Sequence, residues 1–250
     1  MSGHSKWHSI KHKKAAVDSK RGKIFGKHAK LVAVAARKGG DPNMNPSLRA
    51  AIDNARAENM PFENIERAVK KGSGESKDAA QYEEVIYEAY GPGGTAFLIE
   101  TLTDNRNRTI SNLKTIISKK GGNIGAAGSV AYLFKKKGLI EITAGQKSGE
   151  EIELAAIDAG AEDIKTGDEM IEIYTEPASL MQIRNGLEKN GIKTGAARLV
   201  YVPQTETAIA DADTAKKLFD FIEAIEEDED VTIVYSNENV ADEVLRQISD

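Results

Sequence analysis

The spacing of apolar residues changes from helical to strand-like partway along the chain. In residues 22–40, 45–59 and 61–72, apolar side chains recur every three or four positions, which predicts three short helices. Asn45 and Pro46 are typical of the cap and first position of a helix. These elements predict a small N-terminal helical bundle.

The first predicted helix has an apolar side and a cationic side. We expect its apolar residues to face the core, and these are Ile24, His28, Leu31, Val32 and Ala35. Its other side carries a row of cations at helical spacing, which consists of Lys20, Lys23, Lys27 and Lys30. Ordinary exposed helix faces mix both signs of charge, and no acidic residue occurs between Lys20 and Lys38.

From Tyr82 the apolar residues alternate, which predicts strands. The segment "EEVIYEAYGPGGTAFLIETLTDN" indicates two strands joined by a glycine-rich turn. A helix in 109–122 and a strand in 129–134 follow. Residues 138–202 then give the order strand, helix, strand, strand, helix, strand, which is the ferredoxin-like order.

The last predicted helix and strand, in 211–236, cannot bury their apolar faces alone. We therefore expect them to complete the domain that begins at residue 81. The predicted fold is α+β: a small helical bundle, then two ferredoxin-like α+β domains, the last inserted into the middle one. The predicted boundaries are 1–22 for a flexible basic segment, 23–80 for the helical domain, 81–137 plus 204–250 for the middle domain, and 138–203 for the inserted domain.

Composition excludes several classes of protein. The chain has no cysteine, so disulfides, thiolate metal sites and a cysteine nucleophile are absent. It has no apolar run of 18 residues, so we expect no membrane partner and a cytoplasmic protein. The four histidines all precede residue 29 and have no acidic residue beside them to orient a catalytic pair. We therefore expect no enzymatic activity, no cofactor and no small-molecule substrate.

Charge is divided unevenly along the chain. Residues 1–40 carry eleven Lys or Arg and one acidic residue, whereas residues 139–250 carry nine basic and 26 acidic residues. The formal net charge of −5 conceals this asymmetry. A basic end on an acidic protein indicates a polyanionic partner. The acidic run "EEDED" at 226–230 is interpreted as a solvated face.

The basic N-terminus is the candidate nucleic-acid site. Lysines neutralise phosphates, histidines donate to them, and the single tryptophan offers a surface on which a base can stack. The leading contacts are predicted to be Lys6, Trp7, His8, Lys11, His12, Lys13 and Lys14. Behind them we place Lys20, Arg21, Lys23, Lys27 and Lys30, with Arg106 and Arg108 as secondary phosphate contacts. A tail without a specific target is the alternative interpretation.

Two other sites were weighed against simpler explanations. His4, His8 and His12 share a spacing of four, but lysines surround them and no carboxylate accompanies them, so we predict no metal site. The loops "YGPGGT" and "GGNIGAAGS" lack phosphate-loop spacing and are interpreted as a hairpin turn and a close-packed loop. Backbone N–H groups of the second loop remain candidates for a phosphate contact.

Four blocks of the sequence resemble the YebC family: "MSGHSKWHSIKHKKAAVDSKRGKIFGKHAK", "NMPFENIERAVKKGSG", "YEAYGPGGTAFLIETLTDNRNRT" and "GGNIGAAGSVAYLF". The resemblance covers essentially the whole chain. This family includes bacterial proteins assigned as probable transcriptional regulators and a mitochondrial translational activator of cytochrome c oxidase. The resemblance implies three domains, no enzymatic activity and a nucleic-acid partner.

The expected function is a non-enzymatic, nucleic-acid-binding regulator of gene expression, of the kind usually assigned as a DNA-binding transcriptional regulator. The alternative is a ribosome-associated RNA-binding translation factor that assists elongation through difficult stretches such as consecutive prolines. The partner would then be DNA, or ribosomal or transfer RNA, and in the second case the ribosome. An adaptor acting through its acidic half and an unrecognised hydrolase are the rival classes.

Overall fold

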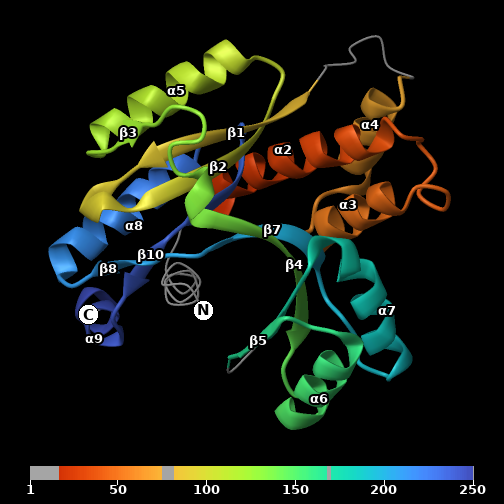
Figure 1. Cartoon of the computed structure of the whole chain (residues 1–250). Helices are drawn as coiled ribbons and strands as arrows, with labels where there is room; N and C mark the ends of the chain where they lie inside the picture. Colours follow the sequence, from red (N-terminus) through yellow and green to blue (C-terminus); the bar gives the residue numbers. More distant parts are fainter. Residues whose placement is uncertain (1–16, 75–81, 168–169, 250) are drawn as a thin grey trace.

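The N-terminal part of the structure is a group of packed helices. The computed structural model describes residues 17–74, 82–167 and 170–249 (Figure 1). The first of these ranges contains α2 (Val17–Ala36), α3 (Pro46–Ala57) and α4 (Phe62–Gly72), and α2 packs against both of the others. The predicted cap of α3 is confirmed, because the Asn45 side chain accepts a hydrogen bond from the Leu48 N–H at 3.1 Å.

The start of α2 differs from the prediction. Residues 17–22 were assigned to a flexible segment, but their backbone belongs to this helix. Gly22 and Gly26 lower helix propensity by about 1 kcal/mol each relative to alanine, which a helix of 20 residues tolerates. The predicted linker segment at 75–81 lies outside the described residues.

The buried face of α2 is rotated by one residue from the predicted face. Val32 and Ala36 are fully buried, with Phe25 and Ala29 packed beside them, whereas Leu31 is 40% exposed. The prediction of Leu31 as a core residue is therefore wrong. A side chain at Gly72 of α4 would overlap the Ala33 backbone, so close helix packing selects the face with small residues.

The middle domain is built on a four-stranded sheet with the order β3-β1-β2-β9. Its strands are β1 (Glu83–Tyr90), β2 (Ala96–Thr103), β3 (Asn123–Ile124) and β9 (Val231–Ser236). β1 and β2 are antiparallel around a short turn, η1 (Pro92–Gly94), so the predicted hairpin is confirmed. β9 pairs with β2, which brings residues near the C-terminus into a sheet that begins at residue 83.

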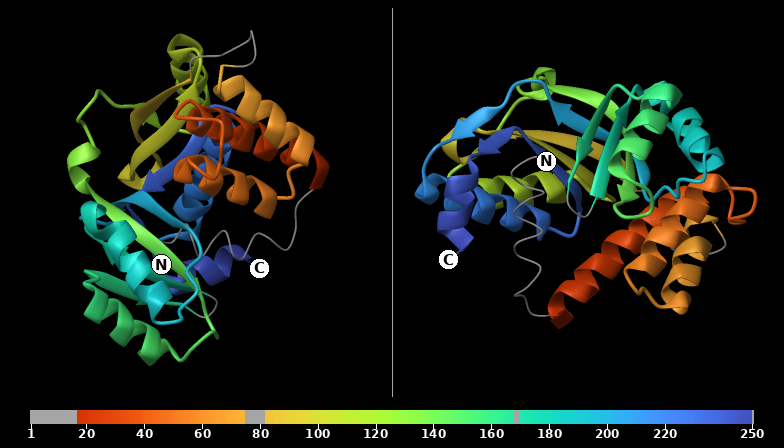
Figure 2. Two further views of the ribbon diagram at one scale, coloured as in Figure 1. Left: turned by 90° about the vertical axis from the view of Figure 1, so that its right-hand side faces the viewer. Right: turned by 90° about the horizontal axis from the view of Figure 1, so that it is seen from below.

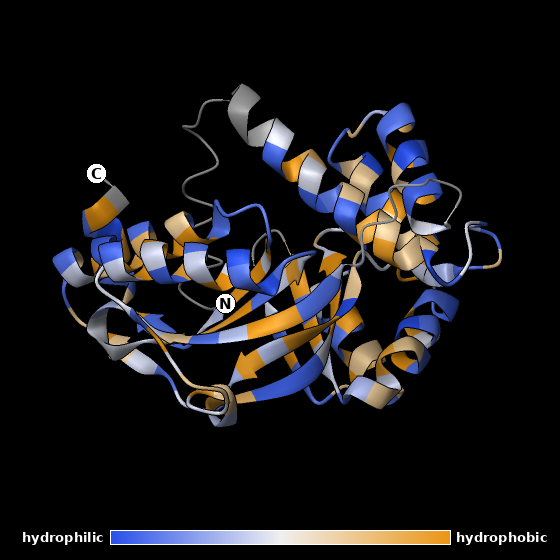
Figure 3. Cartoon of the chain, turned by 90° about the horizontal axis from the view of Figure 1, so that it is seen from above, coloured by the Kyte–Doolittle hydropathy of each residue, from blue (hydrophilic) through white to orange (hydrophobic). Residues whose placement is uncertain are grey.

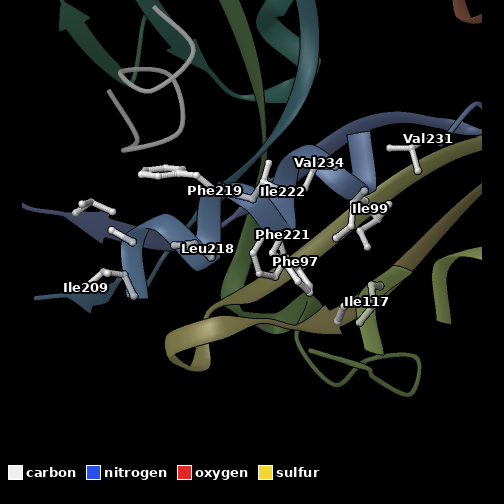
Figure 4. Packing of buried hydrophobic residues seen from close by; sticks show 14 of the residues in the cluster. Phe97, Ile99, Ile117, Ile209, Leu218, Phe219, Phe221, Ile222, Val231 and Val234 are labelled. Atoms are coloured by element: carbon white, nitrogen blue, oxygen red, sulfur yellow. The ribbon is translucent and has the colours of Figure 1, made fainter. Parts of the chain in front are cut away.

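Two helices cover one face of this sheet: α5 (Arg106–Lys119) and α8 (Ala212–Glu226). Their apolar residues and those of β2 and β9 form the largest buried cluster (Figure 4). Phe97 of β2 and Phe221 of α8 meet at its centre, with ring centroids 4.9 Å apart. A parallel pair, β8 (Thr207–Ile209) and β10 (Glu238–Val240), and α9 (Asp242–Ser249) flank α8.

The inserted domain has a second four-stranded sheet with two helices on one face (Figure 1). Its elements follow the predicted order: β4 (Phe134–Thr143), α6 (Gly149–Ala159), β5 (Asp163–Thr166), β6 (Met170–Thr175), α7 (Leu180–Lys189) and β7 (Ala197–Pro203). η3 (Pro177–Ser179) precedes α7. The strand order β5-β6-β4-β7 is the ferredoxin-like arrangement. The helices and strands enclose a separate apolar cluster that includes Ile140, Ile152 and Ile183.

The two sheet domains share β4. Phe134, at the start of β4, is buried with Ala96, Leu98 and Val130 of the middle domain, whereas Ile140, farther along β4, is buried under α6 and α7. The boundary predicted at residue 138 therefore falls inside a continuous strand. The strand predicted at 129–134 is instead largely a 3₁₀ turn, η2 (Ala131–Leu133).

The α+β fold class predicted from sequence is confirmed. Figure 2 shows the helical group and the two sheet domains as three lobes. In Figure 3 the strands carry apolar stretches interrupted by hydrophilic ones, as expected for sheets that bury one face. Among the described helices, none is long and apolar enough to cross a membrane.

Candidate nucleic-acid interface

The predicted contact residues fall into three groups in the structure. The leading residues, from Lys6 to Lys14, lie outside the described part of the chain. Lys20 and Arg21 belong to the first turns of α2 by their backbone, but their side chains are not described. Lys23 is exposed on the same helix.

Lys27 and Lys30 of α2 contact the C-terminal end of α8 and the segment that follows it. The Lys27 Nζ donates to the Glu226 carbonyl oxygen at 2.6 Å, at the C-terminal end of α8. The Lys30 Nζ donates to the Glu229 carbonyl oxygen at 2.9 Å and to the Asp230 Oδ1 at 2.7 Å. The C-terminal end of a helix attracts cations because its last carbonyl groups are unpaired. These two lysines therefore join the helical domain to the middle domain.

Asp230 is the centre of this junction, and its side chain is fully buried. Arg108, in the first turn of α5, binds both carboxylate oxygens through Nη2, at 3.0 and 2.8 Å. The Thr109 hydroxyl lies 2.8 Å from Oδ2, and the Lys30 ammonium completes the set from α2. We call Asp230, Lys30, Arg108 and Thr109 the Asp230 cluster.

The Asp230 cluster satisfies the hydrogen-bonding needs of a buried charge. Burial raises the pKa of Asp230, but hydrogen bonds from Lys30, Arg108 and Thr109 outweigh it, so the pKa is held below its ordinary value of 3.8. The carboxylate is thus charged in the folded protein at neutral pH. An isolated buried carboxylate would be strongly unfavourable, and paired cations remove that cost.

The cluster corrects three sequence-based expectations. Lys27 and Lys30 are not free cations, because both bind oxygen atoms of the chain. These partners lie about two hundred residues away in the sequence, so no local pattern reveals them. Arg108 is held by Asp230 and also contacts Asp104 at 2.9 Å. The run "EEDED" is not only a solvated face, since its last residue is buried. The available signal was an acidic residue directly before the apolar segment "VTIV" of β9.

Arg106, the other predicted secondary contact, is exposed at the start of α5. Its Nε pairs with the Glu83 carboxylate at 2.5 Å, with both side chains more than half exposed. Exposed pairs of this kind contribute little, up to about 1 kcal/mol, and their partners exchange readily with other ions. Arg106 is therefore accessible to a phosphate, whereas the Arg108 guanidinium is held by the buried Asp230 carboxylate.

The glycine-rich loop that begins at residue 121 surrounds an anion that belongs to the protein itself. Backbone N–H groups of Gly128, Val130 and Ala131 donate to the Glu88 carboxylate at 2.5, 2.6 and 2.9 Å. Burial raises the pKa of Glu88, and these donors outweigh burial, so the pKa lies below its ordinary 4.5. One donor of the loop that was a candidate for a phosphate, the Gly128 N–H, is therefore occupied, and the prediction of a close-packed loop describes this segment better.

His28 of α2 is half-buried and lies near Glu58 at the end of α3. Burial lowers the pKa of His28 below its ordinary value of 6.5, and Glu58 offsets this only in part. Its Nδ1 is buried without a hydrogen-bond partner in the described structure. His28 is therefore a neutral packing residue of the helical domain. Among the described residues, no cluster of three or more His, Cys, Asp or Glu side chains forms a metal site.

The fold and the charged junction define a class: a three-part α+β protein whose helical domain is joined to a sheet domain through buried charges. Comparison with known proteins identifies the family. The model of the TACO1/YebC protein N-terminal domain matches residues 5–75, and that of the TACO1/YebC second and third domain matches residues 82–238. The chain belongs to the TACO1/YebC family.

Curated relatives match along the full length of the chain. A protein of Treponema denticola is 51% identical, with 95% of this chain and 96% of the relative covered. A protein of Halothermothrix orenii is 46% identical, with both chains fully covered. Each of these two relatives carries the name "probable transcriptional regulatory protein".

A solved structure has the same fold. The crystal structure of a conserved hypothetical protein from Aquifex aeolicus is 47% identical, with a TM-score of 0.83. The similarity covers 94% of this chain and 97% of that chain. The resemblance to the YebC family seen in the sequence is therefore confirmed.

Proposed function

We propose that this protein is a non-enzymatic regulator of gene expression that binds nucleic acid through basic surfaces of its helical and middle domains. The observation that carries the proposal is the division of charge, with eleven basic residues and one acidic residue in residues 1–40 of a protein with net charge −5. The names of the relatives support regulation as the role. The proposed place of action is the cytoplasm.

The Asp230 cluster supports a defined orientation of the basic surface. It ties α2 to the sheet domain by a buried, charge-assisted contact, so the exposed Lys23 projects from a fixed helix. A polyanion that contacts Lys23 on α2 is then close to the middle domain as well. Contacts spread over two domains add phosphate neutralisation without requiring base recognition.

An RNA target in translation is the second candidate function. It is favoured by residue type: the basic leader contains lysines, histidines and one tryptophan, which suit backbone contacts and stacking on an unpaired base. A transcriptional regulator that reads operator sequence would need base-reading side chains placed in a groove. The two candidates therefore predict different ratios of specific to nonspecific binding.

Fluorescence anisotropy with labelled RNA and DNA hairpins of the same sequence tests the proposal. We expect binding that weakens with salt, and we expect removal of residues 1–16 to abolish most of the affinity. The logarithm of affinity should fall by about 0.7 to 0.9 per neutralised phosphate for each tenfold rise in salt. Failure of the full chain to bind either probe at low salt would contradict the proposed function.

The preference between the two probes separates the two candidates. Tighter binding of RNA, together with co-sedimentation with ribosomes that nuclease abolishes, would assign the protein to translation. Tighter binding of the DNA hairpin, together with recovery of chromosomal fragments by crosslinking, would assign it to transcription. A chain without residues 1–16 that still binds as tightly as the full chain would contradict the role of the basic leader in both.

A further inference from the structure

The middle domain contains a long segment without acidic residues. From Asn105 to Ile140 the chain has eight Lys or Arg residues and no Asp or Glu. Such a segment is unusual in a protein with 34 basic and 39 acidic residues, since exposed surfaces ordinarily mix both signs. Its helical part is α5, which lies on the surface of the middle domain (Figure 1).

Within this segment, the cations differ in whether they have partners. Arg106 and Arg108 are paired with carboxylates, and so are Lys135 and Lys137 of β4. In contrast, four exposed lysines have no ion pair among the described residues. One of them, Lys136 of β4, lies over the Tyr201 ring. The other three are Lys114, Lys119 and Lys120, which lie on α5 or directly after it.

The outer face of α5 is shaped for close approach by a chain of phosphates. The buried side of the helix carries Leu113 and Ile117. At about 100° per residue, Ser111, Thr115 and Ser118 form a central strip on the opposite side. Small side chains along a strip let a ligand approach the helix, and hydroxyl groups hydrogen-bond phosphate oxygens.

Lysines border this strip on both sides. Lys114 and Lys119 are about 140° apart around the helix axis and about 7–8 Å apart along it. That axial distance spans about two phosphates of one strand at about 3.4 Å each. Lysines near the end of a helix also complement its dipole, but Lys114 lies mid-helix, where that effect is absent.

We propose that this outer face of α5 is a second nucleic-acid-binding surface, which holds a sugar-phosphate backbone. The proposal rests on the proposed function and names the part of the middle domain that carries it. α5 begins at the Asp230 cluster, where α2 docks, so the two helices are held together by one buried contact. Lys114 and Lys119 supply charge beside the strip, Lys120 adds charge at the C-terminal end of the helix, and Ser111 and Ser118 supply hydroxyl donors.

The test compares two triple variants of the full chain in the salt titration described above, with RNA and DNA probes in parallel. The first variant is Lys114→Gln, Lys119→Gln, Lys120→Gln. The matched control removes the same charge from exposed lysines elsewhere: Lys189→Gln, Lys216→Gln, Lys217→Gln. We expect the first variant to lower the salt slope by about 2 to 3, and the control to leave it nearly unchanged.

The outcomes separate the two proposals. An unchanged slope in the α5 variant, with binding that still depends on residues 1–16, would overturn this inference and leave the proposed function standing. Equal losses in the α5 variant and its control would also overturn the inference, because net charge alone would then explain them. Absence of binding by the unmodified chain would overturn both. A thermal midpoint equal to that of the unmodified chain shows that the variant is folded.

Discussion

Two helices of this protein carry rows of cations that look alike in the sequence and differ in the structure. No acidic residue occurs between Lys20 and Lys38, yet Lys27 and Lys30 are held by the C-terminal end of α8 and the segment that follows it. The exposed lysines of α5 also lack acidic neighbours, and the described structure provides no ion-pair partner for Lys114 or Lys119. Charge runs therefore identify a basic helix, whereas only the tertiary structure separates cations used in folding from cations left for a ligand.

The difference follows from where each helix lies. α2 joins two domains, so one of its sides faces the C-terminal end of α8, which is electronegative. α5 covers a sheet within one domain, so its outer side meets solvent. Some charged side chains of a helix between two domains are therefore used in contacts with the second domain. Charged side chains on the outer face of a helix that covers a sheet stay exposed to solvent.

The largest expected effect is on folding stability at the junction of α2 and α5. Asp230→Ala leaves Lys30 and Arg108 without their buried partner, and breaking a buried ion pair by removing one member costs about 3–5 kcal/mol. Chemical denaturation should show this loss. Glu227→Gln, an exposed change in the same run, should stay within about 0.5 kcal/mol. An Asp230→Ala variant as stable as the parent would refute the structural role of the cluster.

A smaller effect is expected at the loop around Glu88. Glu88→Gln keeps the size of the side chain but weakens three charge-assisted hydrogen bonds, which should cost about 1–3 kcal/mol. Because the pKa of Glu88 is lowered in the folded state, this stability is present above pH 4.5 and is lost as the pH falls through the folded pKa. The stability difference between Glu88→Gln and the parent should therefore shrink in acid, and a constant difference would contradict the assignment.

The smallest effect concerns His28. Because burial lowers its pKa in the folded state, it contributes stability above pH 6.5, which is lost as the pH falls through the folded pKa. NMR titration of the imidazole should show a midpoint below 6.5. His28→Gln should flatten the pH dependence of stability in that window, and a midpoint above 6.5 would show that Glu58 dominates.

Much of the fold was predictable because it depends on local pattern. The βαββαβ order of the inserted domain, the hairpin at residues 90–95 and the cap at Asn45 all follow from short-range periodicity and turn chemistry. The buried face of α2 was not predictable in this way, because the apolar residues of this helix form two overlapping stripes. Contact with Ala33 and Gly72 selects between them, and that contact is tertiary.

The site was less predictable than the fold. Asp230, Glu88 and the partners of Lys30 are brought together by segments far apart in the sequence. Both acidic residues sit beside apolar strand residues, which is a weak signal of burial that a charge count conceals. The residues from Lys6 to Lys14 stay a prediction, since they lie outside the described part of the chain.

The most direct test of the contrast between the helices is the rate at which each lysine is modified by an acylating reagent, measured by mass spectrometry with and without bound nucleic acid. We expect slow modification of Lys27 and Lys30 in both states. We expect fast modification of Lys114, Lys119 and Lys120 in the free protein and protection in the complex. Fast modification of Lys30 in the free protein, together with unprotected lysines on α5 in the complex, would contradict the contrast between α2 and α5.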